Sequence, residues 1–193
     1  MANLDKFSDP NVTAKGEARA RVALTHPETL WFNTGTLCNI ECVNCYIDSS
    51  PTNDALVYIT ADEVKDYLQQ LLSRNWPVRE IAFTGGEPFM NPEMIDIAEC
   101  SLAAGYEVLI LTNAMLPMMR KRVKQGLLEL NAAYPGKLTL RISLDHFDRA
   151  NHGRACCTRR AEQSTDSNPK GVEIKLVALG GSYYTNGFGR ERR

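Results

Sequence analysis

The sequence predicts a parallel α/β fold, an open sheet or partial (β/α) barrel of four to five strands. Short apolar runs alternate with amphipathic segments of 12–17 residues, which is the pattern of strands joined by crossover helices. In addition, a polar motif follows each of the first four apolar runs. Because parallel strands end at the same edge of a sheet, we expect these motifs to meet there and form a site.

Length and composition are those of a globular protein. The chain has 193 residues, of which 44% are hydrophobic and 23% charged, enough for the core of one domain and too apolar for a disordered chain. The sequence has no run of 18 apolar residues, so no membrane span is predicted. The first 21 residues contain no apolar block of the kind found in a secretory signal. We therefore expect a cytoplasmic protein whose six cysteines are reduced.

The elements can be predicted in chain order. Residues 1–27 form a polar lead-in with a short helical stretch that ends at His26-Pro27. Thr60 and Glu63 form a capping box at the start of the first long helix. Asn91-Pro92 begins the second, with Gly105 at its C-cap, and a third helix is expected over 117–133. The expected strands are 30–36, 78–83, 107–111 and 137–144, with a further candidate at 172–179.

Three cysteines, Cys38, Cys42 and Cys45, lie within eight residues of a polar loop. Packing in a core does not explain such a cluster, whereas a soft metal centre does. Structural zinc sites require four ligands, usually in two pairs, and no second pair follows. Three thiolates suit a [4Fe–4S] cluster with one open iron; zinc or another metal, and a loop without a ligand, are the alternatives. Cys100 fits the apolar pattern of a packed helix residue.

The other motifs consist of glycine, hydroxyl, amide and carboxylate groups. In the turn Thr84–Pro88, Gly85 and Gly86 stand where the backbone turns sharply or approaches a ligand closely. Glu87 provides a carboxylate suited to an ammonium group, although an ordinary strand–helix turn also accounts for this motif. The polar residues that follow strands three and four suit a ribose or an amino acid, but they are also common as caps and turn residues. These residues are Asn113, Ser143 and Asp145.

Taken in order, CNIECVNC, GGEP, TN and SLD over residues 30–146 resemble the motifs of the radical S-adenosylmethionine (radical SAM) enzymes. The resemblance implies a partial parallel barrel of radical SAM type in which Cys38, Cys42 and Cys45 bind three irons of a [4Fe–4S] cluster. It implies that SAM chelates the open iron and that the Gly85-Gly86-Glu87-Pro88 turn holds its amino group. The same resemblance places three polar residues along the carboxylate and ribose of SAM, namely Asn113, Ser143 and Asp145.

The resemblance also implies an activity. Reductive cleavage of SAM would give a 5′-deoxyadenosyl radical, which abstracts hydrogen from a small-molecule or peptide substrate. An electron donor such as flavodoxin or ferredoxin would be required, and the protein would be sensitive to oxygen. The alternative is a non-catalytic module that binds an iron–sulfur cluster or zinc.

The end of the chain differs from the rest. Residues 1–149 contain 14 basic and 19 acidic residues, whereas 150–193 contain 8 and 4. We divide the chain into the lead-in 1–27, a core 28–148 and a basic tail 149–193, which has room for one helix near 149–163 and one strand. The family usually has six strands. This chain can be interpreted in two ways. It is an open five-stranded variant of the fold, or its tail departs from the fold at about Gly153 through truncation or a shifted reading frame. The change in charge favours the second interpretation. With no aromatic stripe in the tail, a nucleic-acid partner is not expected.

Overall fold

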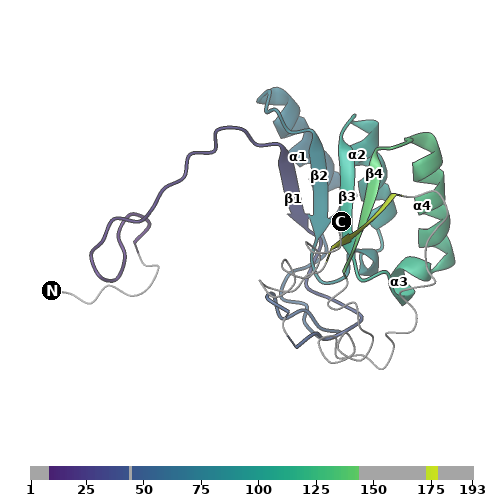
Figure 1. Ribbon diagram of the computed structural model, residues 1–193, viewed down its shortest axis with the longest axis horizontal. Coiled ribbons are helices and arrows are strands. Elements are labelled where there is room, and N and C mark those ends of the chain that lie inside the picture. The colour runs from purple at the N-terminus through teal and green to yellow at the C-terminus, as the bar shows by residue number, and fades with distance from the viewer. Residues whose placement is uncertain (1–8, 44, 144–172, 178–193) are drawn as a thin grey trace, which may run out of the picture.

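The computed structural model describes residues 9–43, 45–143 and 173–177 (Figure 1). Its five strands form one parallel sheet in the order β1-β2-β3-β4-β5. The strands are β1 (Thr29–Asn33), β2 (Glu80–Thr84), β3 (Glu107–Thr112), β4 (Leu138–Ser143) and β5 (Glu173–Val177). The predicted parallel α/β fold with four to five strands is therefore confirmed, and the fifth strand lies within the range 172–179 expected for it.

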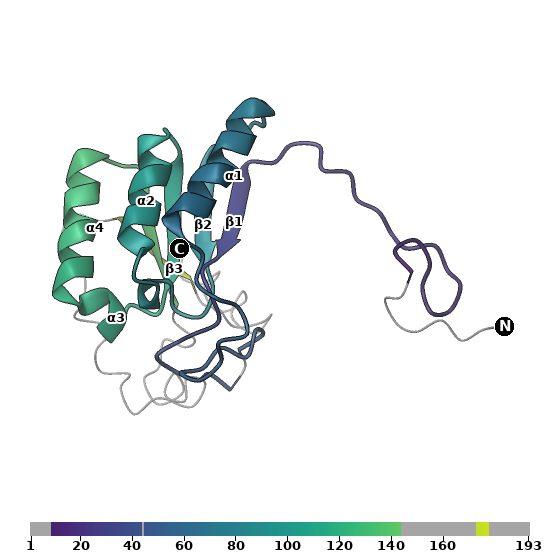
Figure 2. The ribbon, with the colours of Figure 1, turned by 180° about the vertical axis from the view of Figure 1, so that it is seen from behind.

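All described helices lie on one face of this sheet (Figure 2). They are α1 (Ala61–Ser73), α2 (Met94–Ala103), α3 (Leu116–Met119) and α4 (Lys121–Ala133). Each strand pairs with the next one in the chain, so right-handed crossovers place every helix on the same side, as in a (β/α) barrel. With at most 13 residues, the described helices are too short to span a bilayer.

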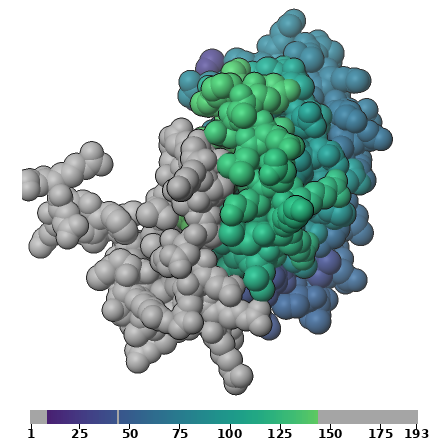
Figure 3. Space-filling model, turned by 90° about the vertical axis from the view of Figure 1, so that its right-hand side faces the viewer, coloured from purple at the N-terminus to yellow at the C-terminus, as the bar shows by residue number. Residues whose placement is uncertain are grey.

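The hydrophobic core lies between this face and the helices. Phe83, Ile110 and Leu140, from three neighbouring strands, are completely buried and belong to the same cluster as Val64 of α1 and Leu127 of α4. In the space-filling view, α3 and α4 form a continuous surface over the side of this core (Figure 3). Cys100 packs against the cluster from α2, as predicted.

Local sequence signals correctly predicted several boundaries. The Thr60 hydroxyl accepts a hydrogen bond from the backbone N–H of Glu63 (3.2 Å), and the Glu63 carboxylate accepts one from the N–H of Thr60 (2.8 Å), which is the predicted capping box. Gly105 follows α2 with a φ of +96°, and the N–H of Tyr106 donates to the carbonyl of Ser101 (3.3 Å). This arrangement is a glycine-terminated helix end.

Two helix predictions differ from the structure. The helix expected from Asn91-Pro92 starts at Met94 and is preceded by a 3-10 turn, Pro88–Met90. The helix expected over 117–133 is divided at Arg120, whose backbone is extended (φ −57°, ψ 137°). Met118 and Leu127 are nine residues apart and would face opposite sides of a continuous helix. The break allows both to be buried, at 1% and 0% exposure.

The N-terminal region also differs from expectation. In the described part of the lead-in, residues 9–27, there is no helix. Instead, Val12 and Ala18 form an antiparallel bridge around a turn that contains Gly16 at φ +79°, and an extended arm leads from there to β1 (Figure 1). This segment has no apolar face to stabilise a helix. The predicted helix near 149–163 lies outside the described residues.

Candidate functional site

The predicted motifs meet at the carboxyl ends of the strands. β1 leads into the cysteine loop, β2 into the turn Gly85–Pro88 and β3 into Asn113, while Ser143 is the last residue of β4. In Figure 1 these connections gather at the lower end of the sheet. Asp145, the remaining predicted site residue, lies outside the described residues.

The cysteine loop is closed at its base by a bridge between Leu37 and Ser50, where the N–H of Cys38 donates to the carbonyl of Ser50 (3.1 Å). Cys38 is buried at 5% exposure, whereas Cys42 and Cys45 are half-buried. Within the described part of the chain, no three Cys, His, Asp or Glu side chains surround a common point in a metal-binding arrangement. The structure thus brings the three thiols to one loop but not to a single centre.

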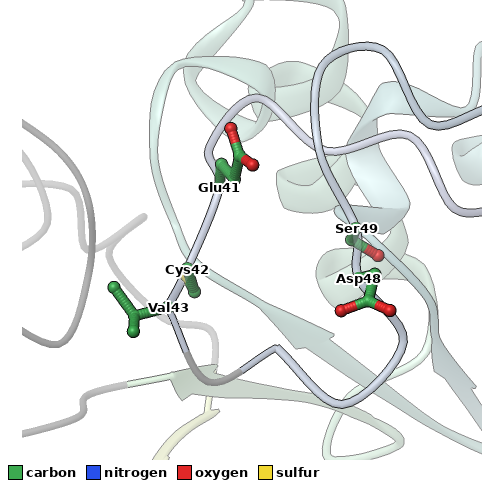
Figure 4. Close-up of a pocket in the computed structure, with 5 residues that line it drawn as sticks. All are labelled: Glu41, Cys42, Val43, Asp48 and Ser49. Atoms are coloured by element: carbon green, nitrogen blue, oxygen red, sulfur yellow. The ribbon is translucent and has the colours of Figure 1, made fainter.

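A pocket of about 260 Å³ opens inside this loop (Figure 4). Cys42 and Val43 line it from one limb of the loop, and Asp48 and Ser49 line it from the returning limb. Ser49 is buried at 4% exposure, and its hydroxyl has no hydrogen-bond partner among the described residues. A buried polar atom without a partner is costly, so this hydroxyl is available to a water or a bound group at the pocket.

N–H groups are directed at two of the cysteine sulfurs. The side-chain amide Nδ2 of Asn113 lies 3.8 Å from Cys38 Sγ, and the backbone nitrogen of Ser49 lies 3.3 Å from Cys45 Sγ. Burial raises the pKa of the Cys38 thiol to about 11, and the nearby Glu87 carboxylate acts in the same direction. A metal that binds this sulfur must therefore displace its proton. Hydrogen bonds to sulfur ligands tune iron–sulfur clusters. The residue types of the loop, three thiols with N–H donors beside two of them, therefore suit such a cluster, although the thiols do not converge on one point in this arrangement.

The two glycines of the turn after β2 pack against the segment that leads into the cysteine loop. A Cβ on Gly86 would stand 2.2 Å from the carbonyl oxygen of Leu37, and one on Gly85 would stand 2.7 Å from that of Gly35. Gly85 also has a φ of +144°, which favours glycine. The N–H of Gly86 donates to Gly35 O (2.8 Å), and the N–H of Glu87 donates to Leu37 O (3.1 Å). The two glycines thus allow the segments that follow β1 and β2 to approach within hydrogen-bonding distance.

The carboxylate of Glu87 is almost completely buried, with 2% of the residue exposed. It accepts hydrogen bonds from the Thr112 hydroxyl (2.7 Å), the Asn113 backbone N–H (2.8 Å) and the Phe89 backbone N–H (3.2 Å). Burial raises the pKa of this carboxyl group to about 7, although the three donors act against it. Glu87 therefore ties the turn after β2 to the end of β3, and both of its oxygens have partners within the protein.

The structure adds three contributors to the predicted site residues, and two of them, Thr112 and Asn39, stand inside the motifs TN and CNIECVNC. Thr112 binds Glu87, Asn39 accepts a hydrogen bond from Asn113 (3.0 Å), and Arg141 lies two residues before Ser143 on β4. Residues two apart on a strand share a face, so the alternation in β4 is a signal for Arg141. The Nε of Arg141 is buried and has no hydrogen-bond partner in the part of the chain that the structure describes.

Comparisons with known proteins agree with this geometry. The model of the radical SAM superfamily matches residues 32–166. The "Antilisterial bacteriocin subtilosin biosynthesis protein AlbA" of Bacillus subtilis is 34% identical over 115 residues, which cover 60% of this chain and 23% of AlbA. The AdoMet-dependent heme synthase of Methanosarcina barkeri is 29% identical over 96 residues, or 49% of this chain and 27% of the synthase.

Solved structures share the fold. The crystal structure of Streptococcus suis SuiB bound to S-adenosylmethionine superposes with a TM-score of 0.56 at 19% identity, covering 69% of this chain and 29% of SuiB. The chain thus spans less than a third of the length of each of these three proteins.

The family match extends to residue 166, and β5 pairs with β4 in the same sheet. The two interpretations of the tail 149–193 stay predictions, because most of these residues lie outside the described part of the chain. The match includes more than half of the 193 residues. This chain therefore belongs to the radical SAM superfamily, whose cofactors are a [4Fe–4S] cluster and S-adenosylmethionine.

Proposed function

We propose that this chain forms the cofactor-binding core of a radical SAM enzyme that modifies a peptide. The observation that carries the proposal is the meeting of the cysteine loop, the glycine turn and Asn113 at one sheet edge, with N–H donors directed at two cysteine sulfurs. The names of two similar proteins support a peptide substrate: AlbA is named for the biosynthesis of a bacteriocin, and SuiB has a structure bound to the precursor peptide SuiA.

Each motif has a role in this proposal. Cys38, Cys42 and Cys45 hold three irons of the [4Fe–4S] cluster and leave one iron for SAM. The turn Gly85-Gly86-Glu87-Pro88 and three further polar residues surround SAM, namely Asn113, Ser143 and Asp145. When bound, the two cofactors supply the one-electron cleavage of SAM to a 5′-deoxyadenosyl radical that abstracts hydrogen from the substrate.

The chain's own side chains prepare this chemistry. Cys38 is buried, so it would hold its iron away from water. The Gly86 contact with Leu37 holds the cysteine loop against the turn that would bind SAM. Glu87 holds the end of β3 and with it Asn113. The reducing cytoplasm suits free thiols, and the electron would come from a flavodoxin or ferredoxin.

Anaerobic reconstitution of the 193-residue chain with iron and sulfide tests the cofactor assignment. We expect about four irons per chain and, with dithionite and SAM, formation of 5′-deoxyadenosine. Cys42→Ala should lose both iron binding and 5′-deoxyadenosine formation, because one thiolate ligand is removed. Cys100→Ala is the matched control, since this cysteine packs in α2 outside the loop and should retain both properties.

Two outcomes would contradict the proposal in different ways. Unchanged iron binding in Cys42→Ala would refute the ligand assignment. Iron binding by the wild-type chain without any 5′-deoxyadenosine would support a non-catalytic metal-binding module instead.

Deuterium transfer tests the substrate class. A deuterated peptide pool is incubated with the reconstituted chain, SAM and dithionite, and 5′-deoxyadenosine is analysed by mass spectrometry. Deuterium in the nucleoside is expected, because hydrogen abstraction from a peptide carries it there. The same assay is run with a deuterated iron porphyrin. Deuterium transfer from the porphyrin and none from peptides would overturn the peptide assignment and favour a porphyrin substrate, in keeping with the name of the heme synthase.

A further inference from the structure

The side chain of Asn113 connects the end of β3 with the cysteine loop. Its Nδ2 lies 3.0 Å from Asn39 Oδ1 and 3.8 Å from Cys38 Sγ. Cys38 is 75 residues away in the chain, so the contact arises from the fold. A sulfur atom is larger than oxygen, and an N–H group at this distance still donates to it.

The orientation of this amide follows from its neighbours. Its Oδ1 accepts a hydrogen bond from the Met115 N–H (3.0 Å), whereas its Nδ2 faces an oxygen and a sulfur, both acceptors. A flipped amide would place two oxygens in contact and set its NH₂ group against the Met115 N–H. The backbone of Asn113 is fixed in turn by its hydrogen bond to Glu87 Oε2 (2.8 Å).

A donor in this position has a consequence for reduction. When a cluster gains an electron, negative charge increases on its sulfur ligands. A hydrogen bond to sulfur stabilises the more negative state, because a charged acceptor binds an N–H group more strongly. Hydrogen bonds to sulfur are among the factors that determine cluster potentials.

We infer that the Asn113 amide donates a hydrogen bond to Cys38 as a cluster ligand and raises the reduction potential of the cluster. Glu87 is the positioning residue that holds Asn113 in place. The inference deepens the proposed function and rests on it, since it requires Cys38 to bind iron.

Asn113→Leu removes the amide and keeps the branching of the side chain, with the same number of non-hydrogen atoms. The matched control is Asn91→Leu: Asn91 is buried at 3% exposure and donates its amide to Ile59 O (2.8 Å) next to α2. Iron content is measured first, and the potential is then titrated by EPR without SAM. We expect Asn113→Leu to bind iron with an about tenfold smaller equilibrium constant for reduction, which is about 59 mV for one electron. Asn91→Leu should keep the wild-type potential even if it lowers stability.

A second variant and a spectroscopic signature keep the test independent of folding. Asn113→Asp preserves the size of the side chain but replaces the N–H donor by oxygen, so its potential should fall further. Pulsed EPR of the reduced chain, labelled with ¹⁵N at the side-chain amide of asparagine only, should show a nitrogen coupling that is lost in Asn113→Asp and kept in Asn91→Leu. A wild-type potential in the Asn113 variants, or an unchanged coupling, overturns this inference alone. A wild-type chain that binds no iron overturns the proposed function together with it.

Discussion

Replacing Glu87 with glutamine should change how the stability of the fold depends on pH. The side chain is buried, and burial raises its pKa from 4.5 to about 7. An acid whose pKa is higher in the folded state contributes stability that is fully present below its unfolded pKa and is lost as pH rises through its folded pKa. Wild-type protein therefore loses this contribution between about pH 4.5 and pH 7, whereas glutamine has no charge to bury.

The size of the effect follows from these two values. At 1.36 kcal/mol per pH unit, the difference between 4.5 and about 7 corresponds to about 3 kcal/mol. Glu87→Gln keeps the volume and one carbonyl acceptor for the donors from Thr112 and Phe89. We thus expect the variant to be less stable than wild type at about pH 5 and to approach or exceed it at about pH 8.

Urea unfolding of the metal-free chain under reducing conditions, followed by circular dichroism at several pH values, measures this difference. Glu63→Gln is the matched control, because hydrogen bonds from Thr60 lower the pKa of the exposed Glu63. Its contribution is present above the unfolded pKa and lost on acidification, so its pH trend has the opposite sign. A Glu87→Gln difference that stays constant from about pH 5 to pH 8 would refute the burial of an ionisable carboxyl group at this position.

Three further substitutions test the packing of the site and its scaffold. Gly86→Ala should lower the free energy of unfolding by about 1–3 kcal/mol and reduce iron binding, because its Cβ would stand 2.2 Å from Leu37 O; normal iron content with wild-type stability in urea unfolding would contradict this close approach. Thr60→Ala should cost about 1 kcal/mol through loss of the capping box with Glu63, with iron content unchanged in the same reconstitution assay. Arg141→Met should leave thermal stability unchanged or raise it, because the buried Nε has no partner to lose among the described residues; a large fall in the melting temperature would show that the guanidinium is bound.

Much of the fold could be predicted because the signals are local. The Thr60–Glu63 capping box at the start of α1 and the C-terminal Gly105 after α2 each act within one helical turn, and the structure contains both. The apolar runs correctly predicted the strands, because a parallel strand covered by helices must be hydrophobic. The break at Arg120 was missed because it depends on which side of each helix meets the sheet, which the neighbours decide.

The sequence by itself determined which chemical groups are present and at which end of the sheet they gather, since parallel strands place every following loop at one edge. Only the tertiary structure decided which of these groups contact one another. Glu87 and Asn113 are 26 residues apart, and Asn113 and Cys38 are 75 apart. A hydrogen bond over such a separation depends on strand order and register, which bring distant segments within about 3 to 4 Å. For the same reason, the burial that raises the pKa of Glu87 could not be predicted from the polar sequence of its turn. This burial comes from distant chain segments that pack around the carboxyl group.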